Sequence, residues 1–500
     1  MENNILDFLW KSAKKYPEKV AFCDSEGNKI TFLELADQVK KIGSYIIENY
    51  KNEKKGVVVL TDRNIKSIPV FLGVVYSGNF YIPVDCSLPD ERLKTMFDLA
   101  SPFLIIDCGE KLHENISNKI LFFDDLSPLS IKDQKKNISI DALYGIFTSG
   151  STGNPKLILK NHISLINFIN SYTELFGFKN SDVQGNQIPF YFDASTKDLF
   201  TTLKVACTTN IIGKNYFSQP GRLAQYLIDN KINSICWVPS AMAMLSMFGV
   251  FNKINLTQLT RVLFVGEAMQ SKQLKIWKNA LPNTKFINLY GSTENAGNCL
   301  YYEVKDEIEE NKRIPIGKEF PNCKVFLLDD EDKIINKNDI LSRGEICISG
   351  DILSLGYYKD FPASESKFCQ NPANNEYYER IYKTGDVGQY DENGNIVYIC
   401  RKDYQIKLNG YRIELGDIEV VASSVENIDG VCCLFDEIKK RIVLYYGAKK
   451  DVLDNLKKSL KEKLPFYMLP TKYICLESLP INRNGKTDRV KIKELYKQYE

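Results

Sequence analysis

The stretch TSGSTGNPK (Thr148–Lys156) follows the apolar run ALYGIF (142–147), which has the composition of a buried strand. Glycines let a backbone approach an oxyanion closely, hydroxyl groups donate hydrogen bonds to it, and a lysine adds positive charge. A loop of this composition behind a strand is typical of a phosphate-binding site. It is not a Walker A loop, because the spacing differs and Lys156 is followed by Leu157 rather than Ser or Thr. The alternative, a flexible Ser/Gly linker, does not explain Pro155 and Lys156.

Short apolar runs alternate with helical patterns on both sides of this loop. Runs such as VVVL (57–60), YGIF (144–147) and RVLFV (261–265) predict strands, and the stretches between them predict helices. This alternation predicts an α/β domain of helix-covered, mostly parallel sheets. From about Ile314 onward, the runs KVFLLD, GEICIS and NIVYIC are separated by turn-forming residues. They predict a small antiparallel, barrel-like region.

The last hundred residues have a different composition. Short strands there alternate with helical patterns such as DVLDNLKKSLKEKL, and residues 401–500 carry a charge balance of +5 against −3 for residues 1–400. We expect a large domain over residues 1–401 and a small α+β domain over 402–500. The boundary then falls near Arg401–Asp403.

Composition excludes several classes of function. Lys plus Arg is 65 and Asp plus Glu is 63, so the net charge of +2 gives no strong field for nucleic acid or an anionic membrane. With two histidines, a multi-histidine metal site or a histidine-based triad is not expected. The 13 cysteines form no Cys-x-x-Cys pair and predict buried, reduced thiols. No leader-like or membrane-spanning stretch is present, which predicts a cytoplasmic protein.

Four further segments carry side chains suited to nucleotide chemistry. Tyr290 could stack on a base, Glu294 could hold Mg²⁺, and Asp386 could accept hydrogen bonds from two ribose hydroxyls. Lys486 lies on a glycine-containing turn, where a lone lysine is usually solvent-exposed. The segments are NLYGSTE (288–294), YKTGD (382–386), RKDYQIKLNGYRIELGDIE (401–419) and NRNGKTDR (482–489).

Together these segments resemble the adenylate-forming enzymes. The resemblance is greatest to the amino-acid adenylation domains of nonribosomal peptide synthetases and to the D-alanine–carrier-protein ligases. With FDAS (192–195) and GEICISGDILSLGYYKD (344–360), seven segments follow that family's order and rough spacing over nearly the whole chain. Each segment is degenerate alone, but the ordered set is specific. The resemblance implies a large domain followed by a small, mobile C-terminal domain that rotates about a hinge at Asp403.

The resemblance also implies an ATP-dependent, AMP-forming ligase that uses Mg²⁺. A carboxylate attacks the α-phosphate of ATP, giving an acyl-adenylate and pyrophosphate, and a thiol then takes the acyl group. The first step depends on control of charge, because two anions must meet. By resemblance Lys486, Glu294 and Thr148 act in catalysis, with Glu294 as the metal ligand. The implied nucleotide-binding residues are Thr148, Ser149, Gly150, Ser151, Thr152, Gly153, Lys156, Asn288, Tyr290, Gly291, Thr293, Asp386, Arg401 and Lys486.

The identity of the acid depends on Asp193, which matches the aspartate that pairs with the substrate ammonium in amino-acid-selecting relatives. An acid without an amine would leave this carboxylate unpaired, which predicts strong discrimination. Lys197 in the pocket wall favours an acidic amino acid such as glutamate, ahead of D-alanine or another small residue. The alternatives are that Lys197 reaches solvent or pairs with Asp198. The implied pocket residues are Asp193, Ala194, Lys197, Ser240, Leu263, Val265, Leu289, Gly297 and Asn298.

The expected acceptor is the phosphopantetheine thiol of a separate peptidyl or acyl carrier protein, because no carrier-type serine motif occurs in the chain. We expect a monomer that binds neither nucleic acid nor membrane. His162, which follows the phosphate loop, is expected to be structural. One alternative is an acid–CoA ligase, in which free coenzyme A replaces the carrier. The other is a non-catalytic nucleotide-binding protein, which the retained Lys486 and Glu294 disfavour.

Overall fold

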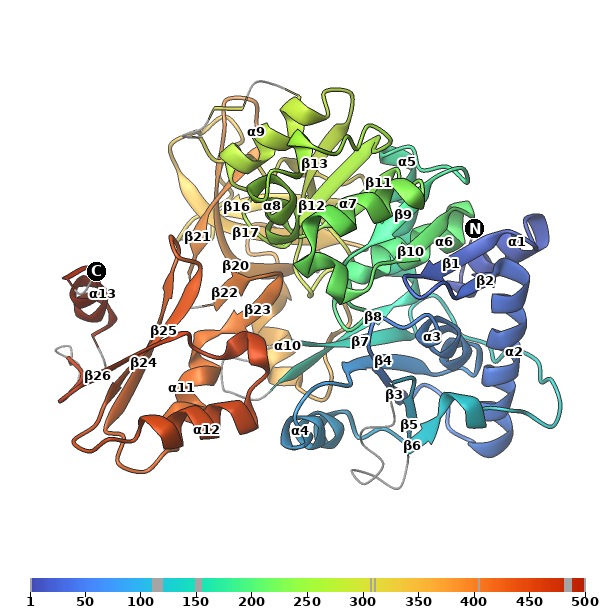
Figure 1. The fold of residues 1–500 in the computed structure, drawn as a ribbon, viewed down its shortest axis with the longest axis horizontal. Helices are drawn as coiled ribbons and strands as arrows, with labels where there is room; N and C mark the ends of the chain where they lie inside the picture. The colour runs from blue at the N-terminus through green and yellow to red at the C-terminus, as the bar shows by residue number, and fades with distance from the viewer. Residues whose placement is uncertain are drawn as a thin grey trace. The chain divides into compact units, whose positions relative to one another are not determined.

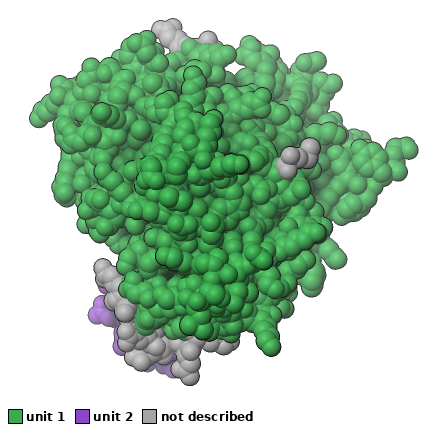
Figure 2. Space-filling view, turned by 90° about the vertical axis from the view of Figure 1, so that its right-hand side faces the viewer, with its two compact units in different colours: residues 1–86, 100–147, 157–402 green, residues 87–99, 148–156, 403–500 purple. Residues whose placement is uncertain are grey.

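The computed structural model describes residues 2–109, 120–148, 155–305, 308–309, 312–402, 405–480 and 488–498 (Figure 1). The chain divides into two compact units (Figure 2). The larger unit comprises residues 1–86, 100–147 and 157–402, and the smaller comprises 87–99, 148–156 and 403–500. Each unit is described by itself.

The larger unit contains a nine-stranded sheet whose central strands are parallel. Its two edges are antiparallel: β2 pairs with β1 at one edge, and β14 pairs with β13 and β15 at the other. In sheet order the strands are β15 (Lys318–Glu319), β14 (Leu300–Glu303), β13 (Lys285–Tyr290), β12 (Arg261–Val265), β11 (Ser234–Trp237), β9 (Val183–Asn186), β10 (Thr208–Ile211), β1 (Val20–Asp24) and β2 (Lys29–Thr31).

A second sheet of seven strands runs through the residues before and after the glycine-rich loop. Strands β3, β4 and β5 pair in parallel, as the alternating pattern predicts. In sheet order the strands are β18 (Gly356–Tyr357), β8 (Lys156–Asn161), β7 (Ala142–Thr148), β4 (Phe80–Asp85), β3 (Gly56–Thr61), β5 (Leu104–Asp107) and β6 (Ile120–Phe122). Tyr81 of β4 lies in register with Tyr144 of β7.

Helices pack between and around these sheets, and local sequence signals fix several of their ends. Thr31 and Glu34 form a reciprocal capping box at the start of α2. The helices of this unit are α1 (Leu6–Lys15), α2 (Phe32–Asn49), α3 (Ser67–Tyr76), α5 (His162–Leu175), α6 (Thr196–Val205), α7 (Pro220–Asp229), α8 (Pro239–Met247), α9 (Ser271–Ala280) and α10 (Phe361–Lys367). Short 3₁₀ turns are η1 (Phe123–Asp125), η2 (Asp193–Ser195), η3 (Lys214–Ser218) and η4 (Val250–Asn252). No helix among the described residues is long and apolar enough to cross a bilayer.

The two faces of the nine-stranded sheet border separate hydrophobic cores. Leu263 and Val265 of β12 belong to one core cluster, and Val262 and Phe264 between them belong to the other. This is the alternation of a strand that is buried on both faces.

A third sheet of five strands is antiparallel, which confirms the change in architecture predicted after Ile314. The strands are β16 (Cys323–Leu328), β17 (Arg343–Gly350), β20 (Arg380–Tyr390), β19 (Phe368–Gln370) and β21 (Ile396–Arg401). Strand β20 pairs with β17, β19 and β21, so it forms the centre of this sheet.

The smaller unit is α+β. It contains a hairpin, a three-stranded sheet and a hydrophobic cluster that includes Ile413, Ile418 and Leu456. Its elements are α4 (Asp90–Ala100, of which residues 90–99 belong to this unit), β22 (Gln405–Leu408), β23 (Tyr411–Glu414), α11 (Leu415–Ser423), β24 (Gly430–Asp436), β25 (Arg441–Gly447), α12 (Leu453–Lys463), η5 (Phe466–Met468), β26 (Lys472–Leu476) and α13 (Arg489–Gln498). All 13 cysteines of the chain are free thiols; 10 of them are buried, and Cys400 and Cys475 are exposed.

Candidate active site

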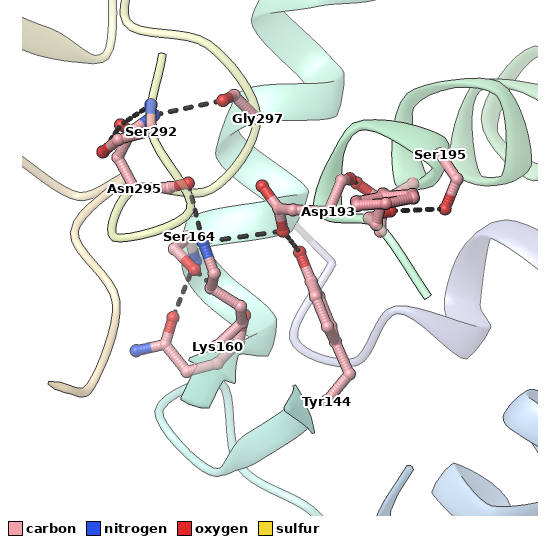
Figure 3. Close-up of polar contacts among 11 residues, drawn as sticks. Tyr144, Lys160, Ser164, Asp193, Ser195, Ser292, Asn295 and Gly297 are labelled. Carbon is pink, nitrogen blue, oxygen red and sulfur yellow. Dashed lines mark hydrogen bonds and ion pairs between the residues drawn. The ribbon is translucent and has the colours of Figure 1, made fainter. Parts of the chain in front are cut away.

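Asp193 begins the turn η2, directly before α6, and is 8% exposed. The Oγ1 of Thr196 donates a hydrogen bond of 2.6 Å to the Asp193 carbonyl and fixes this turn. The Tyr144 hydroxyl donates to Asp193 Oδ1 at 2.7 Å, and Lys160 Nζ lies 3.6 Å from the same oxygen (Figure 3). Within the described ranges, neither a hydrogen bond nor an ion pair reaches Asp193 Oδ2.

The expectation that Asp193 is unpaired without a substrate ammonium is therefore wrong. A buried carboxylate loses its hydration and needs hydrogen bonds or a cation in return. Tyr144 and Lys160 supply both to Oδ1. Only Oδ2 is available to a ligand.

Neither Tyr144 nor Lys160 was predicted from the sequence. The signal for Lys160 was its position in β8, directly after the apolar run Leu157–Leu159 and on the same face as Ile158. Tyr144 lies on β7, the neighbouring strand. Because a lysine on a buried face needs a polar partner, Lys160 could have been predicted from the sequence to contact a carboxylate or a carbonyl group.

The apolar pocket residues lie on one face of the nine-stranded sheet. Leu263 and Val265 alternate on β12, and Val265 is in register with Leu289 of β13. All three belong to the core cluster that also contains Tyr144. Half-buried Ala194 packs against the same extensive cluster. The register brings Val265 and Leu289 together on neighbouring strands.

Lys197 lies in the first turn of α6 and is 1% exposed. The alternative that its ammonium reaches solvent is therefore wrong. Asp198 and Cys236 are close enough to feel its charge. Nevertheless, in the part of the chain that the structure describes, Lys197 makes no hydrogen bond and has no carboxylate within ion-pair distance, Asp198 included.

Three predicted pocket residues lie at turns or helix ends. Gly297 has φ +68°, and a Cβ there would lie 2.2 Å from the ring of Phe168, so only glycine fits. Asn298 is buried, and its Oδ1 has no partner. Half-buried Ser240 is the second residue of α8, and its N–H donates to Glu267 at 3.0 Å.

Three predicted nucleotide-binding residues, Tyr290, Asp386 and Arg401, contact one another. Arg401 lies 2.7 Å from Asp386 Oδ1, and the Tyr290 hydroxyl donates to Asp386 Oδ2. Asp386 and Arg401 lie opposite each other on the paired strands β20 and β21, and Tyr290 ends β13 of the nine-stranded sheet. Burial, followed by the charge of Asp386, raises the pKa of Tyr290 well above its ordinary value, so the phenol remains the donor.

The turn from Gly291 to Asn298 carries the remaining nucleotide candidates. Asn295 closes it, because its Oδ1 accepts from the Ser292 N–H at 2.9 Å and its Nδ2 donates to the Gly297 carbonyl at 3.1 Å (Figure 3). A Cβ at Gly291 would lie 2.6 Å from the Gly297 carbonyl oxygen, so this turn requires glycine. Half-buried Thr293 lies on the same turn, and upstream Asn288 donates to the Pro315 carbonyl at 2.8 Å.

Glu294, the predicted metal ligand, is fully buried on this turn. The Tyr357 hydroxyl donates to its Oε1 at 3.1 Å. Outside the masked ranges, no cluster of three or more His, Cys, Asp or Glu residues could hold a metal ion. A single carboxylate still fits Mg²⁺, which commonly takes one or two carboxylates together with phosphate oxygens and waters.

The phosphate loop is described only at its ends. Thr148 ends β7 and Lys156 begins β8, with the Thr148 Oγ1 3.5 Å from the Lys156 carbonyl oxygen. The other predicted loop residues lie outside the described residues, and so do the catalytic lysine and the hinge: Ser149, Gly150, Ser151, Thr152, Gly153, Lys486 and Asp403.

His162 is fully buried at the start of α5. Its Nδ1 accepts the Ile5 N–H at 3.1 Å, which fixes the N-terminal segment to the fold. Burial lowers the pKa of His162 to about 4, so the ring is neutral near pH 7. These contacts fit the expected structural role.

Comparison with solved structures identifies the fold. The chain superposes on PA1221, an NRPS protein containing adenylation and PCP domains, with a TM-score of 0.88 at 24% identity, covering 99% of this chain and 84% of that one. It also superposes on the adenylation domain AlmE of Vibrio cholerae, solved in complex with glycyl-adenosine-5'-phosphate, with a TM-score of 0.84 at 20% identity, covering 100% and 98%. At these identities the likeness shows the fold, and it confirms the predicted adenylate-forming architecture.

Comparison of sequences identifies the family. D-alanine–D-alanyl carrier protein ligases of Staphylococcus aureus (strain Newman) and Bacillus licheniformis are each 28% identical to this chain, over 98% of its length and 99% of theirs. A profile of the AMP-binding enzyme family matches residues 9–358, which is more than half of the chain. With the predicted fold confirmed, this match shows that the chain belongs to the AMP-binding enzyme family.

Proposed function

We propose that this protein activates an amino acid with ATP and transfers it to the phosphopantetheine thiol of a separate carrier protein. The observation that carries the proposal is the buried Asp193 carboxylate with Oδ2 open, which suits one added ammonium group. The carrier as acceptor draws support from the names of the full-length relatives, which are carrier protein ligases.

In the first step a substrate carboxylate oxygen attacks the α-phosphorus, and the bond to pyrophosphate breaks. The charges of two anions must be offset, which is the role we assign to Lys486 and the loop 148–156. Mg²⁺ would be held by Glu294 and would supply positive charge beside the phosphates. Tyr290, with Asn288, Gly291, Thr293, Asp386 and Arg401, would hold the adenosine. In the second step the thiol sulfur attacks the acyl carbon and AMP leaves.

Asp386 would accept further hydrogen bonds when nucleotide binds. Tyr290 and Arg401 each take one of its two oxygens in this structure. Because each carboxylate oxygen can accept two hydrogen bonds, ribose hydroxyls can add to these contacts or replace one of them.

For the substrate side chain we propose a carboxylate, held by Lys197. A buried ammonium without a hydrogen bond is costly, and an anionic ligand would remove that cost. This assignment differs from the substrate in the relatives' names, D-alanine. The side chain of D-alanine carries no anionic group that could pair with Lys197. Between the two steps, we propose that residues 402–500 rotate about Asp403 and withdraw Lys486.

The test is ATP–pyrophosphate exchange with wild-type protein, Lys486→Ala and Lys197→Met, against a panel of amino acids and amine-free acids. Exchange with an amino acid that falls by about 10²–10³ in Lys486→Ala would support the proposal. Exchange with glutamate or aspartate that is lost in Lys197→Met would support the acidic side chain. If D-alanine were the best substrate and its exchange rate were unchanged in Lys197→Met, the proposal of an acidic side chain would be overturned. The proposal of amino-acid activation would remain.

The acceptor is tested separately. Holo carrier protein, its apo form without the phosphopantetheine arm, and free coenzyme A are compared as acceptors of the activated acid. Acylation of the holo carrier alone fits the proposal. Efficient thioester formation with free coenzyme A would identify an acid–CoA ligase instead, and exchange restricted to amine-free acids would overturn the role of Asp193.

A further inference from the structure

Lys160 is a buried lysine within a strand of the core. It is 0% exposed, and it lies on β8 between apolar Leu159 and the helix-capping Asn161. Burial lowers the pKa of its ammonium, and the charges of Asp193 and Glu294 oppose that shift. A lysine is rarely placed so deep without a specific partner.

Lys160 bridges two segments of the candidate site. Its Nζ donates to the Asn295 carbonyl at 2.6 Å and lies 3.6 Å from Asp193 Oδ1 (Figure 3). Asn295 belongs to the turn that carries Gly291 and Glu294, so Lys160 ties the proposed ammonium-binding carboxylate to the proposed nucleotide turn.

Tyr144 holds the same carboxylate oxygen from a rigid position. Its ring stacks on Tyr81, with centroids 5.5 Å apart and planes at 19°, and Tyr81 stacks in turn on Phe71 at 4.6 Å. In the described part of the chain, the Tyr81 hydroxyl has no hydrogen-bond partner, unlike that of Tyr144. Tyr144 and Lys160 therefore restrain Asp193 Oδ1 from two neighbouring strands.

We infer that Lys160, together with Tyr144, is a positioning residue that sets the specificity of the amino-acid site. By holding Oδ1 of Asp193, the pair presents Oδ2 to the substrate ammonium. This inference rests on the proposed function, because it concerns how the site selects an amine-bearing acid. A carboxylate that is already held in position need not be reoriented when the ammonium binds, so less binding free energy is spent on ordering it.

The test uses Lys160→Met, which keeps the apolar stem and removes the ammonium. The substrates are the best amino acid of the wild-type exchange panel and its analogue with hydrogen in place of the amine. We expect the KM for the amino acid to rise about tenfold, the value of one charge-assisted contact. The KM for ATP should change less, because the turn loses the contact from Lys160 to the Asn295 carbonyl but keeps the Asn295 side-chain contacts to Ser292 and Gly297. The preference for the amino acid over its amine-free analogue should fall by a similar factor.

Tyr144→Phe provides a second, independent variant if Lys160→Met fails to fold. It removes the Tyr144 hydroxyl that donates to Asp193 Oδ1 and keeps the ring. It should also reduce the preference for the amino acid over its amine-free analogue. Tyr81→Phe is the matched control, because it removes a hydroxyl that bonds to nothing, and it should leave the preference unchanged. Thermal unfolding of all three variants separates a loss of fold from a loss of selectivity.

A double-mutant cycle decides whether Lys160 acts through Asp193. In an Asp193→Asn background, Lys160→Met should have little further effect on the amino-acid KM. The inference would be overturned if Lys160→Met raised the amino-acid KM equally in the wild-type and Asp193→Asn backgrounds. It would also be overturned if the KM for the amine-free analogue rose by the same factor as that for the amino acid. Either result would leave the proposed function intact. A wild-type protein that exchanges with amine-free acids only would instead overturn the proposed function, and with it this role of Lys160.

Discussion

Asp193 and Asp386 are two buried carboxylates, each accompanied by a tyrosine hydroxyl and a basic side chain. At Asp386 the two partners take different oxygens, Arg401 at Oδ1 and Tyr290 at Oδ2. At Asp193 both partners take Oδ1, and Oδ2 is left open. The same three kinds of residue thus build two different clusters. We call the cluster at Asp386 closed, because both carboxylate oxygens have a partner, and the cluster at Asp193 open, because Oδ2 has none among the described residues. The difference teaches that composition identifies a polar cluster, whereas its geometry decides how the partners are divided between the two oxygens and which oxygen offers a ligand the most acceptor capacity.

The largest expected effect is on the open cluster. Asp193→Asn keeps the shape of the side chain and removes the charge that would face the substrate ammonium. We expect kcat/KM for the amino acid to fall by about 10²–10³, since breaking a buried ion pair costs about 3–5 kcal/mol. Steady-state exchange kinetics measure this, and an unchanged amino-acid KM would remove Asp193 from the substrate site.

A third buried carboxylate, Asp198, sharpens the comparison because no cation lies within ion-pair distance of it in the described structure. Asn186 donates to it at 2.9 Å, and burial raises the pKa of Asp198 to about 7. At Asp198 the folded protein therefore holds a proton that the unfolded chain releases near pH 4, so the contribution of this one group to stability is full below that pH and is lost as pH rises through about 7. The decline is about 1.4 kcal/mol per pH unit.

Urea unfolding at a series of pH values measures this dependence. Asp198→Asn, which resembles the protonated acid, should remove that part of the slope between about pH 4 and 7. Identical slopes for the two proteins would show that Asp198 does not hold its proton in the folded state.

A smaller effect is expected at the closed cluster. Asp386→Asn leaves Arg401 and Tyr290 with one acceptor oxygen in place of two. We expect the KM for ATP to rise about tenfold, with the amino-acid KM unchanged. The opposite pattern, a changed amino-acid KM with ATP unaffected, would break the division of roles between the two carboxylates.

The smallest effect concerns the stacked pair Tyr81 and Tyr144. Tyr144→Phe should lower the free energy of unfolding by about 1–2 kcal/mol, because it removes a hydrogen bond to a charged group. Tyr81→Phe should leave it unchanged or raise it slightly, because the lost hydroxyl is buried and unbonded. Chemical denaturation of both variants checks this, and equal losses would mean that the hydroxyl bond to Asp193 contributes nothing.

Much of the architecture could be predicted from local patterns. Alternating apolar runs predicted the parallel sheets, and the turn-separated runs after Ile314 predicted the antiparallel one. The order of strands in the nine-stranded sheet could not be predicted, since it depends on pairings between distant segments such as β1 and β10. The grouping of residues 87–99 with the C-terminal unit could not be predicted either, because it also depends on contacts between distant segments.

The site shows the same limit at the level of single residues. Motifs identified Asp193 and Asp386, but their partners lie far away in the sequence, and spacing carries no information about them. Tyr144 is 49 positions from Asp193, and Tyr290 is 96 positions from Asp386. The motif predicted that Lys197 lines the substrate pocket, and this stays a prediction. Its burial and its lack of a partner among the described residues are facts of packing.

That lack of a partner makes Lys197 a natural point for redesign of selectivity. No other described side chain relies on it for a hydrogen bond or an ion pair, so its replacement breaks no such contact among the described residues. Exchanging it for an apolar residue should move the pocket toward apolar amino acids without loss of the fold. Asp193 and Lys160 offer no such freedom, because a change in either one leaves the other charge buried, and evolution would have to alter both together.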